Sequence, residues 1–136
     1  MITIETVYNG DLRTIAKHVF SGAVLVTDAP LDNNGKGEAF SPTDLLAASL
    51  GSCMLTIMGI AARTHGFNIE ETKLEIIKKM ATDPRRVVEV QISFFMPPIK
   101  NSDIEKKILD VAAKTCPVAL SLHPELKQTI QFFYTD

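Results

Sequence analysis

An uncharged run of 18 residues near the middle of the chain, Leu45–Ala62, restricts the possible folds more than any other feature of the sequence. Ser41 and Asp44 stand just before this run, at the spacing of a capping box at a helix N-terminus. We therefore predict one long helix from Ser41 to about Thr64, ended by Gly66.

Two environments suit a helix of this composition. A run of about 18 apolar residues is the lower limit for a membrane span. A helix that is apolar nearly all round is also typical of one enclosed in a protein core. Hydroxyl side chains and glycines within the run, and amphipathic segments around it, favour the core. Two sheets wrapped around the helix would enclose it, and we expect no association with a membrane.

One face of this helix carries small and weakly polar residues. At about 100° per residue, a stripe occupies roughly a third of the circumference. Its members are Ser49, Ser52, Cys53, Thr56 and Gly59. Close packing against a sheet or a partner helix is the simpler interpretation of the stripe, and a cleft beside a reactive thiol is the other.

Shorter segments with the period of strands and helices surround the long helix. Ile2–Tyr8 alternates apolar and polar residues, and Asn9-Gly10 is a strong hairpin signal. Asp28–Phe40 is a loop rich in turn residues. The other expected elements are strands at Leu12–Val19, Ala23–Thr27, Leu74–Met80, Val87–Phe95 and Thr129–Tyr134, a helix at Ser102–Lys114, and a short helix after Pro117. With 136 residues and no linker, the chain is expected to be a single domain over residues 1–136.

Charge and cysteine content argue against several classes of protein. The 14 basic and 16 acidic side chains nearly balance, so no electrostatic footprint indicates nucleic acid. The N-terminus lacks the pattern of a signal peptide. Two cysteines are too few for a disulfide scaffold, which indicates the reducing cytoplasm. The histidines and cysteines have no metal-ligand spacing, so we expect neither a metal nor a cofactor.

The two cysteines differ in their local sequence. Cys53 lies within the apolar helix, where a thiol without charged neighbours is inert. Cys116 precedes Pro117, which suits a cap position for a helix that begins at the proline. A thiolate at that cap faces the positive end of the helix dipole, so we expect a lowered pKa for Cys116.

The sequence around both cysteines resembles that of OsmC/Ohr proteins. Phe40–Cys53 is similar to the cysteine helix of this family, and Thr115–Val118 is similar to its second cysteine motif. The loop at Gly35–Gly37, the separation of the cysteines and the order of the expected elements also match. The resemblance covers essentially the whole chain.

This resemblance implies a fold, an assembly and an activity. The fold is α+β, with two antiparallel sheets around the long cysteine-bearing helix, and two chains intertwine as a homodimer. The activity is that of a thiol-dependent peroxidase, which reduces organic hydroperoxides to alcohols in the response to oxidative stress. Cys53 would become a sulfenic acid, and Cys116 would resolve it as a disulfide. An external dithiol, often a lipoylated protein in this family, would restore both thiols.

The resemblance also indicates which residues would assist Cys53. In the peroxidases an arginine, held by a glutamate, stabilises the thiolate, and Arg13 falls where the family's arginine does. A solvated strand residue is the other interpretation of Arg13. The hydroperoxidases typically have Asn-Pro-Glu where this chain has Ser41-Pro42-Thr43, so Thr43 replaces the glutamate. Glu38, in the preceding loop, is the candidate partner of Arg13.

Other roles stay open at the level of the sequence. The change at Thr43 fits a non-catalytic protein on the same scaffold, in which the thiols sense oxidants or the cleft binds a small apolar ligand. A hydrolase that pairs Cys53 with His18 or His123 is less favoured, because nothing in the sequence places either imidazole beside the thiol. A purely structural role for the cysteines is the remaining alternative.

Overall fold

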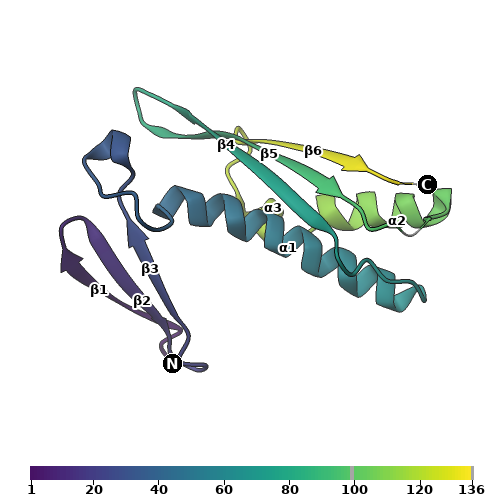
Figure 1. Ribbon diagram of the computed structural model, residues 1–136, viewed down its shortest axis with the longest axis horizontal. Helices are drawn as coiled ribbons and strands as arrows, with labels where there is room; N and C mark the ends of the chain where they lie inside the picture. The colour runs from purple at the N-terminus through teal and green to yellow at the C-terminus, as the bar shows by residue number, and fades with distance from the viewer. Residues whose placement is uncertain (99, 136) are drawn as a thin grey trace. The chain divides into compact units, whose positions relative to one another are not determined.

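The computed structural model describes residues 1–98 and 100–135, which form two compact parts, one over Met1–Leu46 and one that begins at Ala47 (Figure 1). The predicted strands and helices are present, with ends displaced by one or two residues. In chain order the elements are β1 (Ile4–Gly10), β2 (Arg13–His18), β3 (Val24–Asp28), the 3-10 helix η1 (Leu31–Asn33), α1 (Pro42–Thr64), β4 (Lys73–Ala81), β5 (Arg86–Phe95), α2 (Asp103–Lys114), α3 (Pro117–Ser121) and β6 (Lys127–Phe133).

The first part is an antiparallel sheet in the order β1-β2-β3. Its first hairpin turns at Asp11 and Leu12, whose φ angles are 55° and 62°, and not at Asn9-Gly10 as predicted. Gly10 has a φ of 83° and lies beside a shift in the pairing register. The glycine therefore serves a β-bulge, which moves the turn two residues along the chain.

Side chains of this sheet alternate between its two faces, and residues paired across strands share a face. The pairing puts Val7, Ile15 and Val26 in one apolar row, with Val24 on the same face beside Lys17 and Glu5. This face is hereafter called the apolar face of the first sheet. Arg13 and Asp28 are paired at the end of the same face. Val7 is 65% exposed and Val24 57%, so this face has no core of its own within one chain.

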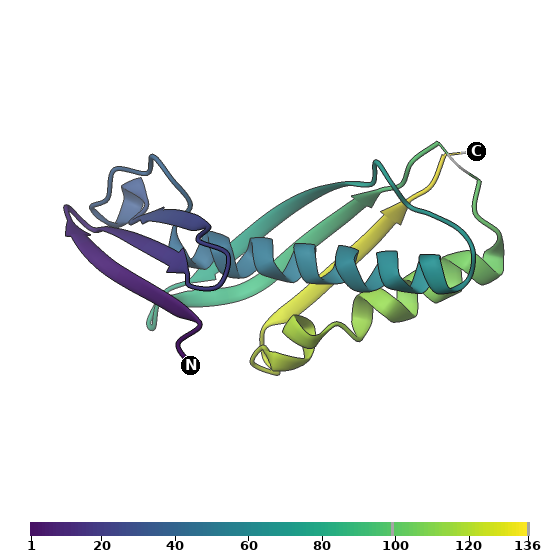
Figure 2. The same cartoon turned by 90° about the horizontal axis from the view of Figure 1, so that it is seen from below.

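The second part is a three-stranded sheet in the order β4-β5-β6, and α1 and α2 cover one of its faces in both Figure 1 and Figure 2. β4 and β5 are antiparallel, whereas β6 runs parallel to β5. The prediction of two antiparallel sheets is therefore wrong for this sheet, which is mixed. Parallel neighbours need a crossover connection, and the segment with α2 and α3 provides it between β5 and β6.

The start and the end of α1 are as predicted. The Ser41 hydroxyl accepts a hydrogen bond from the Asp44 N–H, and the Asp44 carboxylate accepts one from the Ser41 N–H, both at 3.0 Å. The helix ends at Thr64, and Gly66 follows with a φ of 79°. This complete capping box and glycine stop fix the length of the helix that carries Cys53.

One side of α1 belongs to the core of the second part. Its buried residues recur every three or four positions: Ala47, Leu50, Gly51, Met54, Met58 and Ala62. A Cβ atom at Gly51 would lie 2.7 Å from Cδ1 of Ile76 and 3.0 Å from Cδ1 of Leu74. Glycine at this position therefore permits the close approach of α1 to β4.

The opposite side of α1 is open within one chain, and Ser49, Ser52, Thr56 and Ile60 are exposed there. The prediction of a helix enclosed on all sides is therefore not met by a single chain. In the part of the chain that the structure describes, α1 is the one helix long and apolar enough to cross a membrane, and 33% of its apolar window is buried. The core helix of a soluble protein meets the same criterion.

Candidate active site

The two cysteines lie together in the second part of the chain. Cys53 is half-buried on α1, and Cys116 is completely buried just before α3. The Cys53 side chain is one of the groups that raise the pKa of Cys116, so the two side chains are neighbours, and both thiols are free. The structure thus brings together the two residues that the sequence singled out from distant positions.

Cys116 occupies the N-cap of α3, as predicted from Pro117, which is the first residue of the helix. Its sulfur accepts a hydrogen bond from the Ala119 N–H at 3.4 Å. This geometry holds the sulfur at the end of a short helix, with its position defined by the backbone.

The pKa of Cys116 is raised, and the predicted lowering is wrong. Burial is the largest cause, and the hydrogen bond with Cys53 raises the pKa further. The N–H groups of Ala119 and Val118 act in the opposite direction but do not compensate. Desolvation therefore outweighs the helix N-terminus, and Cys116 stays a protonated thiol at neutral pH. A protonated thiol is poorly suited to make the first attack on an oxidant.

Arg13, in the first part, binds two carboxylates. Its Nε donates to Oδ1 of Asp28 at 2.7 Å, and its Nη2 donates to Oδ2 of the same residue at 2.8 Å. Nη2 also donates to Oε1 of Glu38 at 3.0 Å. The expected contact between Arg13 and Glu38 is thus present, but the principal partner of the arginine is Asp28, which the sequence analysis missed.

The three side chains of this cluster differ in exposure. Asp28 is 1% exposed, Arg13 29% and Glu38 66%. The hydrogen bond from Arg13 is the largest cause that lowers the pKa of Asp28, and the same bond raises the pKa of Arg13. Both groups therefore stay ionised across the physiological range, and the cluster of one guanidinium and two carboxylates carries one net negative charge.

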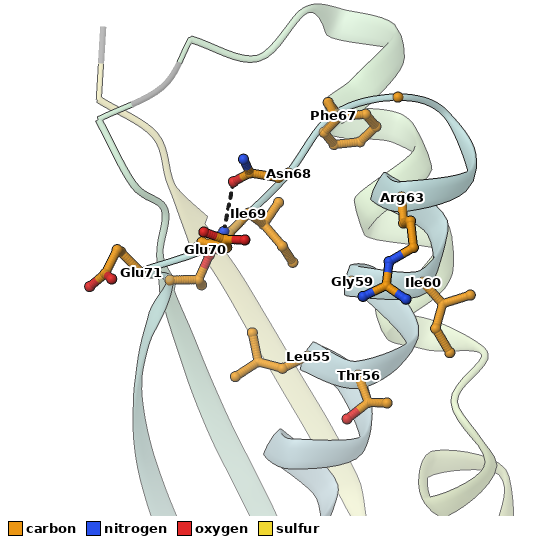
Figure 3. A pocket seen from close by; sticks show the side chains of 12 residues that line it. Leu55, Thr56, Gly59, Ile60, Arg63, Phe67, Asn68, Ile69, Glu70 and Glu71 are labelled. Carbon is orange, nitrogen blue, oxygen red and sulfur yellow. Dashed lines mark hydrogen bonds between the residues drawn. The ribbon is translucent and has the colours of Figure 1, made fainter.

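The largest of the described pockets belongs to the second part and does not contain the thiols. It has a volume of about 800 Å³ and lies between the open side of α1 and the loop that follows the helix (Figure 3). Arg63 and Ile60 of α1 border it on one side, and Phe67 and Glu70 of the loop border it on the other. Neither cysteine lines this pocket, so it is separate from the pair of thiols.

A smaller groove is lined by residues that neighbour each cysteine in the sequence, although neither cysteine lines it. It has a volume of about 430 Å³ and is bordered by α1 and α2. Most of its lining is apolar, with contributions from Ile57, Ala61, Ile108, Val111 and Ala112. Ile57 lies one helical turn from Cys53, and Thr115, which also lines the groove, precedes Cys116.

The histidines have other partners than Cys53. The Nδ1 atom of His18 forms a hydrogen bond with the Ser21 hydroxyl at 2.6 Å, and Nδ1 of His123 accepts one from the Glu125 N–H at 3.0 Å. This geometry does not support a cysteine–histidine hydrolase. Across residues 1–98 and 100–135, no three His, Cys, Asp or Glu side chains gather as a group that could hold a metal ion.

Comparison with known proteins gives consistent results. Residues 35–131 match the family model described as OsmC-like protein. A solved structure from Psychrobacter arcticus 273-4, provisionally named an osmotic stress induced and detoxification response protein, is 52% identical, with a TM-score of 0.94. That match covers 98% of this chain and 96% of that chain. No curated protein matches the sequence at a significant level.

Two more distant structures carry names that refer to organic hydroperoxide resistance. The one from Legionella pneumophila is 14% identical with a TM-score of 0.73, and the match covers 100% of this chain and 98% of that chain. The one from Elizabethkingia anophelis is 14% identical with a TM-score of 0.71, and the match covers 100% and 97%. At this level of identity, the similarity is one of fold.

Proposed function

This chain belongs to the OsmC-like family and has the α+β fold of that family, with two sheets and helices, and from this premise we propose that it is a thiol-dependent peroxidase. Its substrates are organic hydroperoxides, which it reduces to alcohols. Cys53 is the peroxidatic residue and Cys116 is the resolving residue.

The reaction balances with these two cysteines and an external dithiol. The Cys53 thiolate attacks the distal oxygen of the hydroperoxide, the O–O bond breaks, and the alkoxide leaves and takes up a proton as the alcohol. Cys53 is thereby oxidised to a sulfenic acid. The Cys116 sulfur then attacks the Cys53 sulfur, and the hydroxyl group leaves as water with the Cys116 proton. A dithiol, such as a lipoylated protein, reduces the resulting disulfide and becomes a disulfide itself.

The observation that carries this proposal is that the two cysteine side chains are neighbours, since Cys53 is one of the groups that raise the pKa of Cys116. A resolving cysteine must reach the sulfenic acid faster than further peroxide does, and a neighbouring thiol meets that requirement. The raised pKa of Cys116, caused first by burial, supports the order of the two roles. A protonated Cys116 does not compete for the peroxide, and it supplies the proton that leaves with the hydroxyl group.

The apolar groove between α1 and α2 supports an organic substrate. Its lining offers contacts to a hydrocarbon substituent and few polar partners to a small molecule such as hydrogen peroxide. Burial of apolar surface would favour binding of bulkier hydroperoxides by about 25 cal/mol for each Å² removed from water.

Arg13 is proposed as the cation that stabilises the Cys53 thiolate, with Glu38 as a partner of the arginine. A thiolate in apolar surroundings needs such a group, because desolvation disfavours the charged form. The bonds that orient the guanidinium support this role.

A homodimer is part of the proposal. The apolar face of the first sheet and the open side of α1 both expose large apolar side chains within one chain, including Val7 and Ile60. A second copy of the chain would cover these surfaces. The cytoplasm, where dithiols maintain reduced cysteines, is the proposed location.

The proposal is tested by consumption of cumene hydroperoxide and tert-butyl hydroperoxide with a lipoyl dithiol as the reductant. We expect rapid turnover by the reduced wild-type protein and loss of at least about 1000-fold in Cys53→Ser, because the nucleophile is removed. Cys116→Ser should release one equivalent of alcohol but turn over slowly, because the sulfenic acid is not resolved. Turnover of the wild type no faster than that of Cys53→Ser would exclude the peroxidase.

A redox sensor or ligand-binding protein on the same scaffold is the second candidate. The two carboxylates around Arg13 favour it, because they leave the guanidinium without a net positive charge to offer. In that case a stoichiometric amount of peroxide would form the Cys53–Cys116 disulfide, but no dithiol would sustain turnover.

A further inference from the structure

We propose that Gln128 is a positioning residue for the resolving step, which holds the short helix α3 on β6 so that the sulfur of Cys116 is presented to that of Cys53. This inference rests on the proposed function and names a residue that fixes one of its two sulfurs. In the resolving step the Cys116 sulfur bonds to the Cys53 sulfur, and the hydroxyl group of the sulfenic acid leaves as water with the Cys116 proton.

The helix α3 is weakly held by its own residues. It has five residues, which is far below the length at which an isolated helix is stable in water. None of these residues, all of which the structure describes, is buried, and Leu120 is 72% exposed. Burial of the helix itself therefore contributes little to its position, and contacts from outside the helix determine where it lies.

The side chain of Gln128 provides such a contact. Its Nε2 atom donates a hydrogen bond to the Ala119 carbonyl oxygen at 3.0 Å. The last four carbonyl groups of a helix have no partner within the helix, and in a helix of five residues the Ala119 carbonyl is one of them. Gln128 therefore supplies a partner that the helix lacks, and it ties α3 to the beginning of β6, beside which α3 lies in Figure 2.

Ala119 connects this bond to the sulfur of Cys116. Its N–H group donates to Sγ of Cys116 at 3.4 Å, and its carbonyl group accepts from Gln128. The backbone around one residue is thus bonded to the sheet on one side and to the sulfur on the other. A displacement of α3 from β6 would move this N–H group and change the direction in which the sulfur is held. Cys53 is a neighbour of that sulfur, so its direction matters for the resolving step.

The position of Gln128 in β6 is unusual for a polar side chain. It is half-buried and lies opposite Val90, on the same face of the sheet as Ile92 and Phe94. These three residues of β5 are at most 1% exposed. An amide among apolar side chains is unfavourable unless it is hydrogen-bonded, and an apolar residue of the same size would not have this requirement. The residue type therefore fits a role in holding α3 rather than in packing the sheet.

The test uses Gln128→Met, which keeps the length of the side chain and suits the apolar face but cannot donate to Ala119. Gln131→Met is the matched control, because Gln131 is exposed on the opposite face of the same strand. Ser121→Ala is a second control. It removes the hydrogen bond from the Ser121 hydroxyl to the Pro117 carbonyl, which lies within α3 and does not reach the sheet.

The measurement is thiol exchange of the reduced protein with dithiodipyridine, followed by the absorbance of the released thiopyridone in a stopped-flow instrument. The half-buried Cys53 reacts first and forms a mixed disulfide, because Cys116 is completely buried. The Cys116 sulfur then attacks the Cys53 sulfur, the internal disulfide forms, and a second thiopyridone leaves with the Cys116 proton. The first phase reports the reactivity of Cys53, and the second phase reports the position of Cys116.

For Gln128→Met we expect the second phase to be slower by about 10- to 100-fold, because the resolving sulfur is misplaced. Its first phase, and both phases of the two control variants, should stay within about 2-fold of the wild type. A second phase of Gln128→Met that is as fast as that of the wild type would overturn the inference. Equal slowing of both phases, or the same slowing in a control variant, would indicate a general loosening of the fold and would also overturn it.

The outcomes for the inference and for the proposed function are distinguishable, because the exchange assay needs no hydroperoxide. With excess cumene hydroperoxide, Gln128→Met should accumulate sulfinic acid at Cys53, read by mass spectrometry, because the unresolved sulfenic acid meets further peroxide. A wild type that does not consume hydroperoxide would refute the proposed function, and the two phases would still test Gln128. A wild type that consumes hydroperoxide, with an unchanged second phase in Gln128→Met, would refute the inference alone.

Discussion

Cys116 is the N-cap residue of α3, and its thiol is completely buried. The cap alone would lower the pKa of the thiol, and burial raises it by more. The pKa of this thiol is higher in the folded chain than in the unfolded chain. The free energy of unfolding therefore depends on pH.

The reduced protein should lose stability above the ordinary thiol pKa of about 9. In that range the unfolded chain releases the Cys116 proton while the folded chain retains it. The contribution of this thiol to the free energy of unfolding is therefore complete below pH 9. It is lost as the pH rises through the raised pKa that Cys116 has in the folded chain. Urea unfolding under reducing conditions at pH 7.5, 9.5 and 10.5 measures the effect, and Cys116→Ser should show a shallower decrease. The same decrease in both proteins would assign the pH dependence to other groups.

The sequence predicted some residues of the candidate site and not others, for a physical reason. Cys53 and Cys116 lie in local motifs, and Pro117 marks the cap, so their positions could be derived from neighbours in the chain. Asp28 becomes a partner of Arg13 only through the register of β2 and β3. A register shift of one residue would turn Asp28 to the other face of the sheet, and sequence alone does not fix the register that closely.

At the scale of elements, α1 combines two different sides on one helix. The uncharged run predicted that this helix exists, and Ser41 and Gly66 predicted its two ends. Because the helix is apolar nearly all round, the sequence did not predict which side faces the sheet. The two glycines in the helix distinguish the sides, because Gly51 lies against Ile76 and nothing lies within 4 Å of a Cβ atom at Gly59. Pattern alone also missed the parallel pairing of β6, because strand direction depends on the crossover rather than on local residues.

Alanine at the two glycines of α1 should have different effects on stability. Both substitutions gain helix propensity of about 1 kcal/mol. Gly51→Ala also forces Ile76 and Leu74 to move, which costs about 1–3 kcal/mol. We therefore expect Gly51→Ala to be less stable than Gly59→Ala by about 1–3 kcal/mol in urea unfolding. Equal free energies of unfolding would show that β4 does not restrict α1 at this point.

For the whole molecule, the apolar face of the first sheet is the strongest argument for a second copy. A sheet of three strands needs a packed face to be stable, and this one exposes Val7 and Val24 within one chain. The sequence predicted these strands from their alternation. The alternation separates the side chains into two faces, but it does not show what packs on either face.

A charge on this face should dissociate the proposed dimer. Val7→Asp places a carboxylate in the apolar row, where burial without a partner is unfavourable. We expect the dissociation constant from sedimentation equilibrium to rise at least about 100-fold, or about 2.7 kcal/mol. Thr6→Asp puts the same charge on the opposite face of β1, in the row of Ala16 and Leu25, and so shows which of the two faces takes part in the dimer. A protein that is monomeric before any substitution, or equal effects of the two variants, would contradict the dimer on this face.

The parallel pairing of β5 and β6 anchors both ends of the crossover that carries Cys116 on a single sheet. Cys53 is on a helix that packs on the same sheet through Gly51. Both sulfurs are thus tethered to one rigid support, which gives Cys116 a high effective concentration at Cys53. A small external thiol at millimolar concentration would compete poorly with it. Oxidation of Cys53 should therefore end in the internal disulfide rather than in a mixed disulfide with the thiols of the surrounding solution.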